Sequence, residues 1–150
     1  MKKTVATLFT FVLATITCFY LISCKTSYKP MLNSRAGINF KVTTLDDARL
    51  AAKTQNKPLF LFAHASWCPT CKKMEQEVLV QKAVGAAYNQ DFVNVAIDID
   101  SPAGKELQKS YPIRATPTLF FFKADGSLAK KIEGFADVDD LESAALQVDN

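Results

Sequence analysis

The chain has 150 residues, of which 49% are hydrophobic and 22% are charged, and its formal net charge is +3. Lys2 and Lys3 precede every acidic residue, and the remaining 16 basic and 15 acidic residues leave a net charge of only +1. So small an excess disfavours a nucleic-acid-binding protein, and the abundance of large apolar residues excludes intrinsic disorder for most of the chain. Length and composition therefore predict one small folded domain behind a leader segment.

The leader has the pattern of an export signal. Two lysines precede an uncharged, largely apolar run that extends to Ser23. The run is also long enough for an uncleaved transmembrane helix, although its threonines dilute the hydrophobicity. It ends in Leu-Ile-Ser-Cys at positions 21–24, with Lys25 directly after the cysteine.

This ending resembles the lipobox of bacterial lipoproteins. The resemblance implies a lipoprotein signal peptide over residues 1–23 and a lipidated Cys24 as the mature N-terminus. It also implies a periplasm-facing, lipid-anchored protein of the bacterial cell envelope, with Lys25 mildly favouring the outer membrane. An uncleaved anchor and ordinary secretion are the alternatives. Residues 24–37 contain Pro, Asn, Ser and Gly without periodicity and are predicted to be a flexible tether, which leaves residues 38–150 as the folded domain.

The first elements of that domain are a helix and a buried strand. Residues 43–47, Thr-Thr-Leu-Asp-Asp, open an amphipathic helix with a cap-like start. Residues 57–63 begin with a lysine and a proline and continue as a short apolar run, which predicts a buried strand.

Only two of the four cysteines, Cys68 and Cys71, belong to the predicted domain, because Cys18 lies in the leader and Cys24 is the lipidation candidate. With the single His64 they make three potential metal ligands, one fewer than a structural zinc site needs. We expect no bound metal or cofactor, and metal delivery through these three residues is an alternative. In an oxidising compartment, such a thiol pair forms a disulfide that is either permanent or made and broken in turnover.

The flanking sequence places the pair at a strand-to-helix turn. Apolar residues recur at helical spacing over residues 72–84, which predicts one long helix after the pair. Cys68 is then expected at or just before the helix start, where backbone N–H groups stabilise an anion and lower the pKa of a thiol. Cys71, one turn later, is expected to be the more buried, resolving thiol. Closing so short a loop adds little stability, which favours a redox role over a structural disulfide.

The rest of the chain predicts two more strand regions and a last helix. Residues 92–98 form one apolar strand, and residues 118–122 form another after Ala115-Thr116-Pro117. Asp125-Gly126 lies between two strand-like runs and indicates a hairpin. A helix over residues 138–148 closes the fold.

In this order, the elements from Phe40 to Val148 resemble the thioredoxin superfamily. The resemblance implies an α/β thioredoxin fold, with a central mixed β-sheet flanked by helices on both faces. Ala-Thr-Pro before the apolar strand is similar to the family's cis-proline loop, which implies a cis peptide bond before Pro117. It also implies that Thr116 and Pro117 bind the substrate chain beside the cysteines, and that Trp67 contacts substrates.

Residues 64–75 are most similar to exported thioredoxin-like proteins and to the periplasmic C-terminal domain of the transmembrane disulfide reductase. Cytoplasmic thioredoxins carry a buried aspartate and a lysine where this chain has Phe62 and Ala96, so the proton relay of that aspartate is not expected here. His64 is either a titratable neighbour that tunes the thiolate or a strand-end side chain satisfied by backbone or solvent. The sequence favours the second interpretation.

The sequence therefore predicts a membrane-anchored thiol–disulfide oxidoreductase that reduces disulfides in exported proteins through Cys68 and Cys71. The resemblance implies a membrane thiol electron donor. An oxidase or isomerase with the same residues is an alternative, as is a non-catalytic binding module with a permanent disulfide. The oligomeric state, the substrates and the direction of electron flow stay open at this level.

Overall fold

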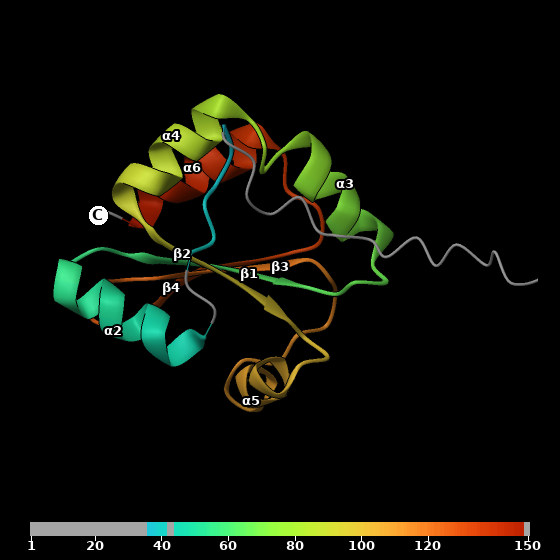
Figure 1. Cartoon of the computed structure of the whole chain (residues 1–150), viewed down its shortest axis with the longest axis horizontal. Coiled ribbons are helices and arrows are strands. Elements are labelled where there is room, and N and C mark those ends of the chain that lie inside the picture. The colour runs from blue at the N-terminus through green and yellow to red at the C-terminus, as the bar shows by residue number, and fades with distance from the viewer. Residues whose placement is uncertain (1–35, 42–43, 149–150) are drawn as a thin grey trace, which may run out of the picture.

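A four-stranded mixed sheet forms the centre of the computed structural model, which describes residues 36–41 and 44–148 (Figure 1). The strand order is β2-β1-β3-β4, with β1 parallel to β2 and antiparallel to β3, and β3 antiparallel to β4. In chain order the elements are α2 (Leu45–Gln55), β1 (Leu59–His64), α3 (Pro69–Glu77), α4 (Lys82–Asp91), β2 (Val93–Asp98), α5 (Pro102–Ser110), β3 (Thr118–Phe122), β4 (Leu128–Glu133) and α6 (Val138–Val148).

Helices cover both faces of this sheet, which confirms the predicted architecture. Helices α3, α4 and α6 lie on one face, and α2 and α5 lie on the other (Figure 1). Every residue of β1 is buried, because successive side chains enter opposite cores. Phe60 and Phe62 pack under α3, α4 and α6, whereas Leu59, Leu61 and Ala63 pack against α2 and α5.

The prediction of a single long helix over residues 72–84 is wrong, because two helices, α3 and α4, occupy this stretch. Between them, the backbone N–H groups of Val78 and Leu79 both donate to the carbonyl oxygen of Met74. The carbonyl oxygen of Leu79 accepts from the N–H of Ile38 at 2.9 Å instead of from the next helical turn. Val78 and Leu79 lie between the two helices and are buried in the core. They are apolar because this turn is buried, and not because a helix continues through it.

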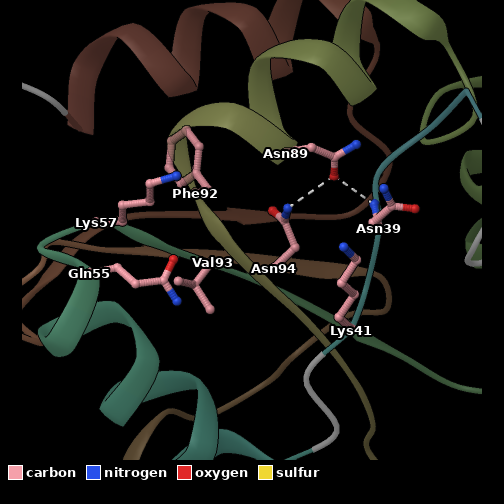
Figure 2. A pocket seen from close by; sticks show the side chains of 8 residues that line it. All are labelled: Asn39, Lys41, Gln55, Lys57, Asn89, Phe92, Val93 and Asn94. Atoms are coloured by element: carbon pink, nitrogen blue, oxygen red, sulfur yellow. Dashed lines mark hydrogen bonds between the residues drawn. The ribbon is translucent and has the colours of Figure 1, made fainter.

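The side chain of Asn89 on α4 links the segment 36–41 to α4 and to β2. Its Oδ1 accepts from the backbone N–H of Asn39 at 2.7 Å and from Nδ2 of Asn94 at 3.4 Å, as Figure 2 shows. Its Nδ2 donates to the carbonyl oxygen of Gly37 at 3.0 Å. Gly37, where the predicted tether ends, is buried, and Ile38 and Phe40 belong to the core under α4.

Gly85 permits this close approach, and it provides a test of the packing. A Cβ atom at position 85 would lie 2.2 Å from the carbonyl oxygen of Ala36 and 2.6 Å from the carbonyl carbon of Gly37. We expect Gly85→Ala to lower the free energy of unfolding by about 1–3 kcal/mol, although helix propensity alone would raise it by about 1 kcal/mol. Urea denaturation followed by circular dichroism measures the change.

The matched control is Ala86→Gly at an exposed position of the same helix. There alanine is expected to be more stable than glycine by about 1 kcal/mol, the ordinary helical preference. Glycine should therefore be more stable than alanine at position 85, and alanine more stable than glycine at position 86. A Gly85→Ala variant as stable as the wild type would show that the segment 36–41 does not lie where the structure places it.

Candidate active site

Cys68 and Cys71 form a disulfide at the junction between β1 and α3. Cys68 is the N-cap residue of α3, and Pro69 occupies the first helical position, where the missing N–H is not needed. Cys71 lies in the first turn and is fully buried, while Cys68 is 2% exposed. The strand-to-helix placement predicted from the sequence is confirmed, and the chemical roles of the two cysteines stay predictions.

Two backbone groups act on the Cys68 sulfur in opposite directions. The N–H of Cys71 donates to it at 3.0 Å, which stabilises a negative charge on the sulfur together with the positive end of α3. The carbonyl oxygen of Thr116 lies 3.4 Å from the same sulfur and accepts a hydrogen bond from it only while the thiol keeps its proton. The balance between these two contacts decides how readily Cys68 becomes a thiolate.

The loop that carries Thr116 and Pro117 lies against the cysteine pair. The Thr116–Pro117 peptide bond is cis, which confirms the prediction. The carbonyl oxygen of Pro117 accepts from the N–H of Gly134 at 2.7 Å, and the hydroxyl of Thr118 donates to the carbonyl oxygen of Ala115 at 2.6 Å. These bonds fix the loop at its C-terminal end and leave Thr116 beside Cys68.

Two exposed aromatic side chains lie on the segments that adjoin Cys68 and the proline loop. Trp67, the residue before Cys68, is 61% exposed, and its indole N–H donates to Oδ2 of Asp100 at 2.7 Å. Phe135 follows Gly134, which is bonded to the proline loop, and its ring lies 5.0 Å from Nζ of Lys73 on α3. The sequence predicts the contact surface at Trp67 but not at Phe135, whose place beside α3 depends on pairing between distant segments.

A buried polar pair lies at the inner side of the same junction. His64 ends β1, as predicted, but it is not turned to solvent, because only 7% of it is exposed and Nδ1 lies 3.8 Å from Oε1 of Glu75. Glu75 is 1% exposed on α3. Burial lowers the pKa of His64, an effect that the charge of Asp98 partly opposes. Sequence reasoning missed Glu75, although its spacing of four residues from the buried Cys71 indicates the same helix face.

One cavity of the structure lies apart from the cysteine pair. The cavity in Figure 2 lies at the start of β1 and β2, at the end of the sheet opposite the cysteines, and is lined by polar side chains including Lys41 and Lys57.

Within 36–41 and 44–148, no three His, Cys, Asp or Glu side chains are grouped as metal ligands. No helix in these ranges is long and apolar enough to cross a membrane. The predicted signal peptide and Cys24 lie outside the described residues.

Residues 45–149 match the family model of the thioredoxin-like domain. The chain belongs to this family. It is 30% identical over 116 residues to the thiol:disulfide interchange protein DsbD of Cronobacter sakazakii. This alignment covers 72% of the chain but 20% of the relative, so the chain spans about one fifth of that protein's length.

Solved structures of the family share the fold. The oxidised C-terminal domain of DsbD from Neisseria meningitidis superposes with a TM-score of 0.55 at 28% identity, covering 71% of this chain and 99% of that domain. A thioredoxin from Thermus thermophilus superposes with a TM-score of 0.67 at 23% identity, covering 75% and 87% of the two chains. The protein therefore has the predicted thioredoxin fold and is a thioredoxin-like protein of the disulfide oxidoreductase type, with a Cys-x-x-Cys pair at Cys68 and Cys71.

The geometry predicts selective alkylation of the reduced pair. After reduction with dithiothreitol, iodoacetamide should modify Cys68 at least about tenfold faster than the fully buried Cys71, since Cys68 is the residue stabilised as a thiolate. Mass spectrometry of proteolytic peptides measures each cysteine separately. In 8 M urea both should react alike, and equal rates in the folded protein would contradict the assignment of Cys68 as the attacking thiol.

Proposed function

We propose that the protein is a membrane-anchored thiol–disulfide oxidoreductase that reduces disulfides in exported proteins. The observation that carries the proposal is the Cys68–Cys71 disulfide at the start of α3, directly beside the Thr116–Pro117 loop. A disulfide with only a structural role would not need an N-cap position that favours a thiolate. The exposed Trp67 adds an apolar contact surface next to the reactive sulfur.

In the proposed reaction, the Cys68 thiolate attacks one sulfur of a substrate disulfide. A mixed disulfide forms, and the first substrate sulfur leaves as a thiolate that takes a proton from water. The Cys71 thiol then loses its proton and attacks the Cys68 sulfur, which closes the Cys68–Cys71 bond and releases the second substrate thiol. The substrate gains two electrons and two protons, and the protein's dithiol loses them.

Thr116 and Pro117 are proposed to hold the substrate chain during these steps. The backbone of Thr116 lies within 3.4 Å of the Cys68 sulfur, so a chain bonded to that sulfur passes next to its peptide groups. An extended substrate segment can form backbone hydrogen bonds there, as a strand added to a sheet edge does. Trp67 would contact the substrate from the other side of the sulfur.

The direction of electron flow and the donor are also proposals. Relatives named thiol:disulfide interchange protein support a partner that exchanges thiols and disulfides with this pair. The C-terminal domain of DsbD from Neisseria meningitidis has been solved in both reduced and oxidised forms. We infer that a membrane thiol relay re-reduces Cys68 and Cys71 after each cycle.

The proposed location is the periplasmic side of the bacterial cell envelope, with an acyl anchor on Cys24. The support is the leader pattern and the Leu-Ile-Ser-Cys ending at positions 21–24. Eleven residues lie between Cys24 and the first described residue, Ala36. At roughly 3.3–3.6 Å per residue, an extended chain of that length reaches about 40 Å, which is enough to hold the domain clear of the bilayer surface.

The reaction predicts different defects for the two cysteines. In dithiothreitol-driven insulin reduction, the wild type should accelerate turbidity, and Cys68→Ser should return the rate to that without protein. Cys71→Ser should trap mixed disulfides, visible as extra bands on non-reducing gels that dithiothreitol removes, because Cys68 can still attack but nothing releases the product. Thr70→Ser, between the two cysteines in the first turn of α3, is the control and should keep turnover. A Cys71→Ser protein that stays monomeric with disulfide substrates would contradict the scheme.

The anchor predicts fatty-acid labelling at one cysteine. When the full chain is expressed in bacteria with an alkyne-bearing fatty acid, the wild type should be labelled and found with the membranes. Cys24→Ser should lose the label, since a serine provides no thiol for acylation. Cys18→Ser is the matched control and should keep it. Labelling of Cys24→Ser, or none of the wild type, would remove the lipid anchor from the proposal and leave the thiol chemistry untouched.

A further inference from the structure

Two charged side chains of β4, Lys131 and Glu133, reach the loop that carries the cis-proline. They lie two residues apart on this edge strand, so their side chains leave the same face of the sheet. In the strand register Lys131 is the partner of Phe120, and Glu133 is the partner of Thr118, the first residue of β3. Nζ of Lys131 and Oε1 of Glu133 are 2.6 Å apart and form an ion pair, the β4 pair.

Each member of the β4 pair also bonds to the backbone of the loop. Nζ of Lys131 donates to the carbonyl oxygen of Pro112 at 2.6 Å, and Oε1 of Glu133 accepts from the N–H of Arg114 at 3.4 Å. In the part of the chain that the structure describes, no other hydrogen bond reaches the backbone of residues 112–114. This stretch, the loop arm, is therefore oriented by side chains of β4.

The surroundings of the β4 pair keep it charged and in one geometry. The hydrogen bond from Lys131 is the main reason why the pKa of Glu133 lies below its ordinary value, and the positive charge of Arg114 acts in the same direction. The side chains of Lys131 and Glu133 are 27% and 33% exposed, and the ammonium lies 5.6 Å from the centre of the Phe120 ring. A pair in such a network keeps its geometry, which most isolated surface pairs do not.

Thr116 lies where the loop arm meets the fixed end of the loop. The bonds described above hold the C-terminal end at Ala115 and Pro117. The loop arm itself belongs to no helix or strand. Without the β4 pair, a flexible segment next to Thr116 would have to be ordered each time a substrate chain binds. Such ordering costs conformational entropy and reduces affinity.

We propose that Lys131 and Glu133 are positioning residues that preorganise the proline loop for the binding of substrate chains. This inference rests on the proposed function, because it gives the β4 pair a role in binding the chain that carries the disulfide. The two side chains act through the backbone of the loop arm on Thr116. Their removal should weaken the binding of a polypeptide substrate and leave the attack on a small disulfide unchanged.

The first measurement tests whether the β4 pair holds the loop arm. Amide hydrogen exchange followed by NMR on the oxidised full chain in detergent gives the rate for the N–H of Arg114. We expect Glu133→Ala to speed this exchange about fivefold or more, because the N–H loses its acceptor. The N–H of Gly134, bonded to Pro117, should keep its rate. An unchanged rate at Arg114 would overturn the inference, whatever the activity of the variant.

The second measurement separates binding from sulfur chemistry. Dithiothreitol-driven reduction at varied insulin concentrations gives KM and kcat. For Lys131→Met we expect KM to rise about three- to tenfold, with kcat within about twofold of the wild type. Methionine keeps an apolar stem beside Phe120 but has no ammonium to donate to Pro112. Lys131→Arg keeps a cation with several donors and should hold KM within about twofold of the wild type.

A small disulfide provides the comparison, because it needs no bound chain. With Cys18 and Cys24 replaced by serine, the reduced full chain releases thionitrobenzoate from 5,5′-dithiobis(2-nitrobenzoate) when Cys68 attacks. In Lys131→Met this rate should stay within about threefold of the wild type, since the start of α3 stabilises the thiolate. The matched control is Lys130→Met, the next position on β4, whose ammonium donates to Gln147 on α6. It should match the wild type in both assays.

Two activity results would overturn the inference. One is a wild-type KM for insulin in Lys131→Met, and the other is an equal loss with insulin and with the small disulfide, which indicates damage to the whole fold. Either leaves the cysteine chemistry in place, because thionitrobenzoate release reports on it separately. A wild type that does not accelerate insulin reduction would instead overturn the proposed function, and amide exchange at Arg114 would still show whether the β4 pair holds the loop arm.

Discussion

The burial of β1 on both faces is the constraint on which the rest of the structure depends. All six of its side chains are enclosed, β2 pairs with it along its whole length, and β3 pairs with it from Leu59 to Ala63. The end of such a strand has little freedom, so the turn that follows presents Cys68 at a defined point and direction. The start of α3 supplies the donor for its sulfur, and the proline loop, which leads directly into β3, supplies the opposing carbonyl. The reactivity of the pair therefore derives from strand packing.

The same packing explains why a carboxylate can be buried here. An isolated ionised carboxylate in a core costs several kcal/mol, and the buried Glu75 is not isolated, because its Oε1 lies 3.8 Å from Nδ1 of His64. Phe62, two residues before His64 on β1, stacks on the imidazole ring. The buried carboxyl group thus comes from the helix side of the core and the imidazole from the strand side.

Features that depend on local sequence could be predicted, and those that depend on distant contacts could not. The apolar run of β1, the N-cap position of Cys68 and the Asp125-Gly126 turn follow from short-range pattern and turn chemistry. The break between α3 and α4 was missed, because a backbone bond from Ile38, some 40 residues earlier, replaces the helical one. Glu75 was missed because an acid in an amphipathic helix is usually exposed, and its burial depends on how α3 packs against β1 and His64.

The attachment of the segment 36–41 has a mechanical consequence. Any force applied from the N-terminal side of Ala36 first loads the Ile38–Leu79 bond and the Asn89 contacts, which lie at the turn between α3 and α4 and on α4 itself. The turn that carries Cys68 is at the other end of α3 from the Ile38–Leu79 bond. A pull on the chain start is thus borne by α4 and the core beneath it, and the geometry around the reactive sulfur is insulated from that load.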